Sequence, residues 1–136
     1  MKRFILVASL LFIWSTIITA QQCENPKAWY NSYNEIYFDN ELPKDTIVKY
    51  KILDKQMAVT QSIDGKHFII DLDPKYNLAA RTAHTVLLHE MCHIETWNEK
   101  EEHGYQWIGC MKRLEKMNAY DNIWIDAYSK KLKTIQ

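Results

Sequence analysis

The run His89-Glu90-Met91-Cys92-His93 brings together the residue types that zinc chemistry requires. Its histidines are four residues apart, so on an α-helix the two imidazoles stand about 40° from each other, one turn apart. Both can then reach one tetrahedral Zn²⁺, while Glu90 flanks the metal without ligating it. A carboxylate placed there can accept a proton from water whose pKa the metal lowers to about 7. The run therefore predicts a metal site with His89 and His93 as ligands and Glu90 as general base.

The surroundings of this run decide its meaning, because a short pattern with two free positions also occurs by chance. Residues 78–98 are expected to form an amphipathic helix with Ala80, Leu87, Met91 and Ile94 on its core stripe. The two histidines lie on nearly the opposite side of that helix. This context favours a real metal site over a chance match.

A catalytic zinc needs a third protein ligand, and His103 is the best candidate. It follows His93 by ten residues, across a polar break, at the head of another expected helix. Acidic residues near enough to compete for this role are Glu99, Glu101, Glu102 and Glu115. Of the other histidines, His84 points about 140° away from His89, and His67 belongs to a predicted surface hairpin.

That further helix is expected to begin near His103 and to turn one stripe inward. The stripe consists of His103, Trp107, Cys110, Leu114 and Met117. Methionines and clustered aromatic residues are interpreted as core filler, Met57 included. Cys23, Cys92 and Cys110 make an odd count, so at least one thiol of a monomer stays unpaired. Cys92 and Cys110 are either buried free thiols or, if their helices run side by side, a disulfide.

The remaining elements follow from local signals. Asn25-Pro26 predicts a helix start, and the apolar spacing carries that helix to about Asp39. Strands are expected at 46–53, 57–63 and 66–72, and Asp64-Gly65 predicts a hairpin between the last two. Helices follow, the last of them short and carrying Ile123, Trp124, Ala127 and Tyr128. This order indicates an α+β domain.

Residues 1–20 differ in composition from the rest of the chain. A cationic start, an apolar run from Phe4 and a terminal Ala20 are typical of a secretory signal peptide. The alternative is an uncleaved anchor, since 17 residues lie at the short edge of what spans a bilayer. We therefore expect residues 21–136 to form the exported domain, periplasmic or secreted, or tethered to a membrane by this segment.

Charge argues against a nucleic-acid partner. The whole chain has 17 basic and 17 acidic residues, and removal of residues 1–20 leaves 15 and 17. Nucleic-acid binders usually carry a basic excess on one face. With 136 residues, 47% of them hydrophobic, the chain suits a single globular domain.

Taken together, these residues resemble the SprT-like zinc metallopeptidase family. The resemblance rests on Tyr37–Pro43, Ile69–Asp73, Leu87–His93 and the His-Gly-x-x-aromatic run His103–Trp107, and it covers roughly residues 30–118. It implies one Zn²⁺ held by three histidines, with His103 as the third, and Glu90 as the catalytic base. It also implies a minimal zincin fold, in which a small sheet packs on the metal helix and the substrate cleft follows the sheet edge.

Three features depart from the family pattern. The gap between His93 and His103 is short, no zinc ribbon follows residue 118, and the N-terminus predicts export. The DNA-associated role of some members is therefore not expected here. The leading hypothesis is a zinc endopeptidase acting on proteins or peptides; the alternative is a zinc-stabilised protein-binding module without proteolytic activity. Tyr76 and Tyr105 are candidates for stabilising the oxyanion.

Overall fold

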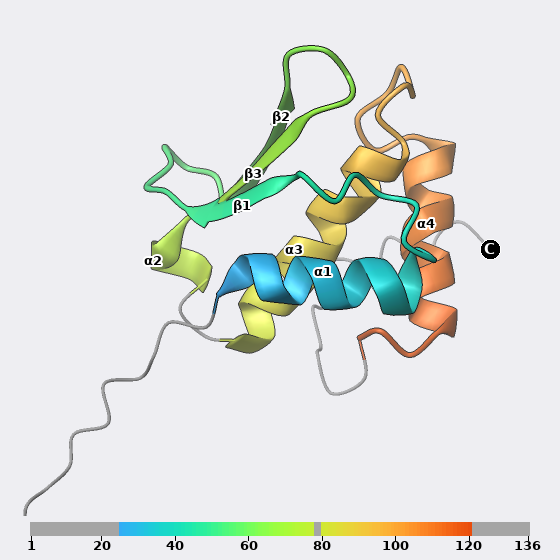
Figure 1. Ribbon diagram of the computed structural model, residues 1–136, viewed down its shortest axis with the longest axis horizontal. Helices are drawn as coiled ribbons and strands as arrows, with labels where there is room; N and C mark the ends of the chain where they lie inside the picture. The colour runs from blue at the N-terminus through green and yellow to red at the C-terminus, as the bar shows by residue number, and fades with distance from the viewer. Residues whose placement is uncertain (1–24, 78–79, 121–136) are drawn as a thin grey trace, which may run out of the picture.

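The computed structural model describes residues 25–77 and 80–120 (Figure 1). Its elements are α1 (Pro26–Tyr37), β1 (Ile47–Tyr50), β2 (Ala58–Ser62), β3 (Phe68–Leu72), α2 (Pro74–Asn77), α3 (Ala80–Glu95) and α4 (Tyr105–Lys116). A three-stranded sheet with four helices confirms the predicted α+β class and fits a minimal zincin-like domain. The expected signal segment, Cys23 and the expected last helix lie outside the described residues.

Helix α1 begins where the sequence predicts. The Asn25 side chain accepts a hydrogen bond from the Lys27 backbone N–H at 3.0 Å, and Pro26 occupies the first turn. The helix ends at Tyr37, before the expected Asp39. Asp39 and Asn40 have φ of 52° and 61°, and this left-handed backbone stops the helix.

The sheet has the order β1-β3-β2. β2 and β3 form the predicted antiparallel hairpin, and Gly65 supplies the positive φ of its turn, 69°. β1 pairs with β3 in parallel, with Val48 opposite Ile70. β3 is therefore the central strand, and one edge of β2 carries no partner strand among the described residues.

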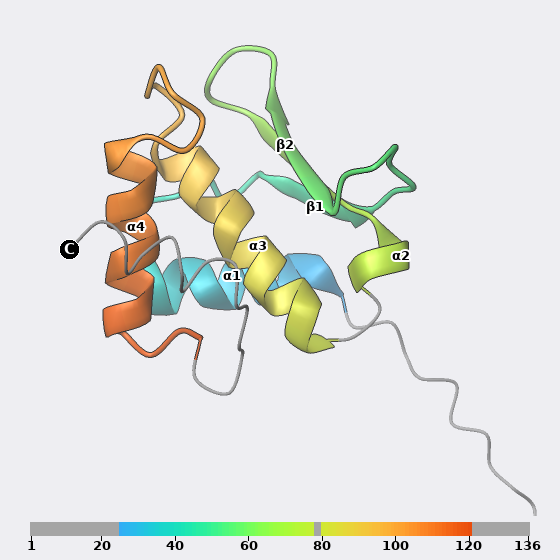
Figure 2. The same cartoon turned by 180° about the vertical axis from the view of Figure 1, so that it is seen from behind.

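Helix α3 runs through the middle of the molecule, with the sheet on one side of it and α1 and α4 on others (Figures 1 and 2). Leu87, Met91 and Ile94 are buried, as predicted. Leu88, His89, Glu90 and Cys92 are buried too, so α3 is covered well beyond its apolar stripe. His89 and Glu90 are therefore largely shielded from solvent, although they lie off that stripe.

The structure contains one short helix that was not predicted, and the limits of two other helices differ from those predicted. Pro74 opens the short helix α2, where the Asp73 carboxylate accepts the Lys75 N–H at 2.8 Å. α3 ends at Glu95 instead of Asn98. α4 begins at Tyr105, after His103, and ends before Met117, which is 43% exposed instead of buried.

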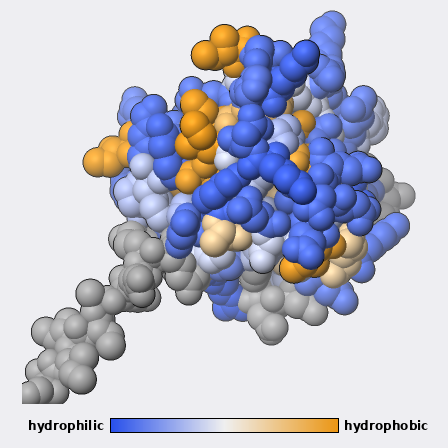
Figure 3. Space-filling view, in the orientation of Figure 1, coloured by the Kyte–Doolittle hydropathy of each residue, from blue (hydrophilic) through white to orange (hydrophobic). Residues whose placement is uncertain are grey.

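Hydrophilic residues cover most of the face shown in Figure 3, where hydrophobic side chains stand in separate small groups. The most exposed large apolar residues include Ile52 and Ile63, both in connections between strands. Scattered residues of this kind are ordinary on a soluble surface. Within residues 25–77 and 80–120, no helix combines the length and the apolar character needed to cross a membrane.

Candidate metal centre

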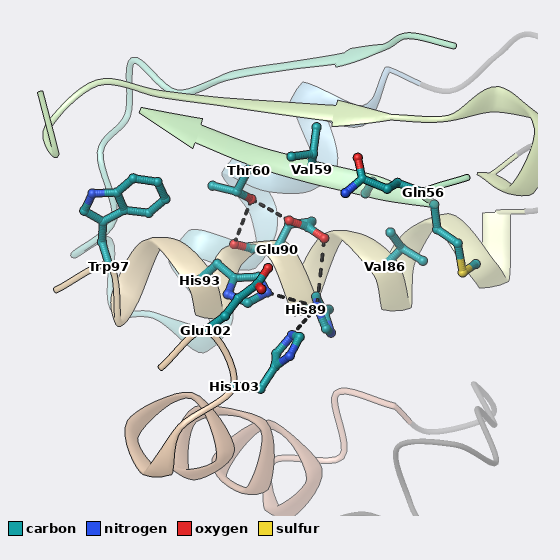
Figure 4. Close-up of a pocket in the computed structure, with 12 residues that line it drawn as sticks. Gln56, Val59, Thr60, Val86, His89, Glu90, His93, Trp97, Glu102 and His103 are labelled. Carbon is teal, nitrogen blue, oxygen red and sulfur yellow. Dashed lines mark hydrogen bonds and ion pairs between the residues drawn. The ribbon is translucent and has the colours of Figure 1, made fainter. Parts of the chain in front are cut away.

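Helix α3 carries His89 and His93 one turn apart and Glu90 next to His89, on the part of the helix that faces β2 and α4 (Figure 4). The Nε2 atoms of His89 and His93 lie 3.1 Å apart. His89 is buried, and His93 is half-buried. The four-residue spacing has therefore brought the two imidazoles together as predicted.

His103 reaches the same point from the connection between α3 and α4, two residues before α4 begins. Its Nε2 lies 3.3 Å from Nε2 of His89 (Figure 4). His103 is partly exposed, and the three histidines together form one cluster of candidate metal ligands. The structure thus brings together all three of the predicted ligands.

The spacing of these nitrogens fits a tetrahedral zinc ion. Zn–N bonds of about 2.0–2.1 Å in tetrahedral geometry separate two ligand nitrogens by about 3.3 Å. Each candidate ligand atom lies within 4.8 Å of the others, and no carboxylate of the described residues belongs to this group. The acidic competitors Glu99, Glu101, Glu102 and Glu115 are therefore outside the cluster. Three imidazoles, with no fourth ligand among the described residues, are the donor set typical of a catalytic zinc.

The protonation of His93 suits a metal ligand. Burial lowers the pKa of His93 from 6.5 to about 4; the nearby His103 acts in the same direction, and Glu102 opposes them. His93 is therefore neutral at pH 7, and a neutral imidazole offers the lone pair that a metal binds.

The indole ring of Trp107 packs against the three clustered histidines. This buried ring lies 4.8 Å from the His89 ring, 5.7 Å from that of His93 and 4.4 Å from that of His103, between centroids. One side chain of α4 thus packs against all three imidazoles. Sequence reasoning placed Trp107 on an inward stripe and, through the resemblance, in the third-ligand motif of His103; it did not predict contact with all three imidazoles.

Glu90 stands beside the cluster in the predicted position. Its Oε1 lies 4.0 Å from Nε2 of His89, and its Oε2 accepts a hydrogen bond of 2.6 Å from Oγ1 of Thr60 on β2. Burial raises the pKa of Glu90 to about 7; the Thr60 hydrogen bond opposes this rise, and Glu102 adds to it. A carboxylate with a pKa near neutrality can both take and return a proton.

A cleft of about 660 Å³ opens over these residues. β2 and the segment before it form one wall and α3 the other, with Trp97 at one end and Gln56 and Val86 at the other (Figure 4). Met57 lines the cleft and is 41% exposed, so its assignment to the core was wrong. Neither Tyr76 nor Tyr105, the two candidates for oxyanion stabilisation, lines the cleft.

A disulfide joins Cys92 of α3 to Cys110 of α4, with their Cα atoms 5.8 Å apart. Cys92 directly precedes His93, so the bond ties the metal helix to α4 close to the site. On the same side, Arg113 of α4 forms an ion pair of 2.8 Å with Glu95 of α3. The pairing that the sequence left open is thereby settled for Cys92 and Cys110.

The other two histidines lie elsewhere. His84 is in contact with the Tyr33 hydroxyl through Nδ1 and packs on Trp29, on the side of α3 that faces α1. His67 lies on the exposed hairpin and bonds Asp64 at 2.5 Å. Both predictions that excluded these histidines from the cluster are confirmed.

The arrangement defines a small zincin-like domain with a three-histidine cluster on its central helix. The model of the SprT-like family matches residues 27–129, most of the chain, and the protein belongs to that family. The predicted resemblance is confirmed. No curated protein sequence matches the chain significantly.

Proposed function

We propose that the protein is a zinc-dependent endopeptidase in which His89, His93 and His103 hold the metal and Glu90 is the general base. One observation carries this proposal: Glu90 Oε1 lies 4.0 Å from a ligand nitrogen, at the cleft. A carboxylate there is close enough to act on a water beside the metal, yet it is not one of the clustered ligands. Membership of the SprT-like family supports the same assignment.

The chain's own residues divide the reaction between them. Zinc bound by the three histidines would polarise the scissile carbonyl and lower the pKa of a water molecule. Glu90 Oε1 takes a proton from that water as its oxygen attacks the carbonyl carbon. Glu90 then returns the proton to the amide nitrogen as the C–N bond breaks, which leaves a free acid and a free amine. Thr60 holds the other carboxylate oxygen, so the base keeps its orientation.

One edge of β2 is paired with no strand of the described residues, and such an edge suits an extended peptide. Substrates of many proteases add a strand to such an edge, where backbone hydrogen bonds fix the register. Here the segment 56–60 lines the cleft directly opposite Glu90. We infer that the substrate is an extended or unfolded stretch of protein, and that nucleic acid is not a partner.

We further propose that the protein acts outside the cytoplasm, in the periplasm or secreted, with residues 1–20 as its signal. The Cys92–Cys110 disulfide supports this proposal, because such bonds persist mainly in oxidising compartments. A membrane location follows only if residues 4–20 remain as an anchor. The mass of the exported protein distinguishes a chain cleaved after Ala20 from an intact one.

The alternative is a zinc-stabilised binding module without proteolytic activity. Residues 21–136 should be compared with Glu90→Gln for zinc content and for cleavage of casein and of an unfolded protein. A peptidase predicts one zinc per chain in both proteins and a rate about 10²- to 10⁴-fold lower in the variant. If the wild-type domain and Glu90→Gln both bind zinc and neither cleaves any substrate, the result would favour the binding module and contradict the peptidase.

A further inference from the structure

Glu99 makes an unusual pair of contacts next to the cluster of His89, His93 and His103. Its Oε1 accepts the Gln106 N–H at 2.9 Å, and its Oε2 accepts the Trp107 N–H at 3.0 Å. Gln106 and Trp107 are the second and third residues of α4, whose N–H groups have no partner inside the helix. The residue at the usual capping position, Gly104, has no side chain to satisfy them. A carboxylate from five residues earlier therefore caps this helix.

Gly104 provides the space for that carboxylate. A Cβ at position 104 would overlap Oε1 of Glu99 and lie 2.6 Å from its Cδ. The backbone does not explain the glycine, because its φ of −76° and ψ of −165° are open to any residue. A side chain at position 104 would therefore displace the Glu99 carboxylate from its place at the start of α4.

Glu99 is also fastened to the end of α3. Its N–H donates to Thr96 O at 2.8 Å, and the Thr96 hydroxyl donates to Cys92 O, also at 2.8 Å. The Glu99 carboxylate thus closes a loop that starts at the end of α3 and finishes in the first turn of α4. His103 lies inside this closed loop.

The loop matters because His103 is the one clustered histidine that no helix holds. His89 and His93 are placed by α3, whereas His103 precedes α4 by two residues. Its Nε2 must nevertheless stay about 3.3 Å from Nε2 of His89. The same α4 turn presents Trp107, whose ring packs against the imidazole of His103. A contact that holds the first turn of α4 in place therefore also holds the imidazole of His103 in place.

We propose that Glu99 is a positioning residue for His103, and that glycine at position 104 leaves room for the Glu99 carboxylate. The proposal rests on the proposed metal site, but it does not depend on proteolysis. Glu99 acts through the backbone of α4, since its oxygens both hold N–H groups and stand outside the ligand cluster. Glu99→Ala and Gly104→Ala should therefore share one phenotype: weaker metal binding with His89 and His93 intact.

The test is the zinc dissociation constant of the full chain and its variants, with Co²⁺ spectra to report coordination. Partners that orient a ligand typically contribute 10- to 100-fold to metal affinity, and we expect that loss in Glu99→Ala and in Gly104→Ala. Glu99→Gln keeps one oxygen acceptor and should fall between wild type and Glu99→Ala. Glu101→Ala is the matched control, an exposed acid in the same loop, and should bind zinc as wild type does.

A double-mutant cycle separates positioning from general stabilisation. If Glu99 acts through His103, the change Glu99→Ala should cause no further loss of affinity in a His103→Ala background. Independent losses that multiply would overturn the proposal, as would wild-type zinc affinity in Glu99→Ala. Should Glu99→Ala fail to fold, Glu99→Gln in the same cycle decides. A wild-type chain that binds no zinc would overturn the metal site itself, whereas zinc binding without proteolysis would contradict only the peptidase.

Discussion

Thr60 of β2 and Glu90 of α3, on the two walls of the cleft, are joined by a hydrogen bond of 2.6 Å from Oγ1 to Oε2. The same hydroxyl lies 3.4 Å from the Glu90 backbone carbonyl. Thr60 therefore holds the Glu90 carboxylate in place beside the three clustered histidines. The bond also stabilises the charged form of Glu90, against the effect of burial.

Thr60→Val should shift the pH dependence of catalysis. Loss of a hydrogen bond to the charged carboxylate raises the pKa of Glu90, and a general base acts only when it is deprotonated. The acidic limb of the profile of kcat/KM against pH should therefore move upward by about 1 pH unit. Gln61→Ala is the control, because this neighbour on β2 is exposed and does not line the cleft. An acidic limb unchanged in Thr60→Val would contradict the role given to Thr60.

Local signals were enough to predict several elements. Asn25-Pro26 marks the start of α1, and Asp64-Gly65 marks the β2–β3 turn, because capping and turn geometry depend on neighbouring residues. The parallel pairing of β1 with β3 was not predicted. It depends on packing between segments far apart in the chain, which no local pattern records. The start of α4 also depends on a contact from outside the helix, because the Glu99 carboxylate caps its first turn.

The site was predictable to the extent that helix periodicity defines it. His89, Glu90 and His93 follow from a spacing on one helix, and His103 from a motif beside it. Thr60 was not found, because only folding brings β2 against α3. The pairing of Cys92 with Cys110 stayed open for a similar reason: it requires α3 and α4 to lie side by side.

Burial of Glu90 should make the metal-free protein less stable at higher pH. The pKa of Glu90 is about 7 in the folded protein and 4.5 ordinarily, so between these values the folded state binds more protons than the unfolded state. The stability contributed by this group is present below about pH 4.5 and lost as pH rises through 7. For a shift of this size, the free energy of unfolding should fall by about 3 kcal/mol from this group.

Denaturant unfolding of metal-free wild type and Glu90→Gln at pH 5 and pH 8 tests this. Glutamine has no charge to bury and can still accept the Thr60 hydrogen bond. Its stability relative to wild type should therefore rise by about 2 to 3 kcal/mol between the two pH values. A constant difference between the two proteins would show that Glu90 has the same pKa folded and unfolded.

His103→Ala should weaken zinc binding more than any change to a residue that only orients a ligand. Three nitrogens converge in the wild type, and two cannot complete the donor set of a catalytic zinc. We expect a loss of affinity of at least about 100-fold, above the range for orienting partners. Titration with a zinc indicator measures it, and His67→Ala, which removes an exposed histidine remote from the cluster, provides the control. Equal affinities in the two variants would exclude His103 as a ligand.

The Cys92–Cys110 disulfide should stabilise both the fold and the metal site. It joins two residues with a sequence separation of 18. By restricting the unfolded chain, a cross-link over a loop of this length adds about 3 kcal/mol to the free energy of unfolding. A Cys92→Ala, Cys110→Ala double variant should lose about that much free energy of unfolding. Its zinc affinity should also fall, because α4 then holds the His103 loop against α3 less firmly.

A thiol reductant separates this bond from other effects of the substitutions. Reduction should lower the stability and zinc affinity of wild type toward those of the double variant and leave the double variant itself unchanged. Cys23→Ser should respond to the reductant as wild type does, because the bond joins the other two cysteines. If reduced wild type keeps its full stability, the bond adds nothing to the packing and ion pairing that already join α3 to α4. If stability falls but zinc affinity does not, the loop that contains His103 is held by the Glu99 carboxylate without help from the disulfide.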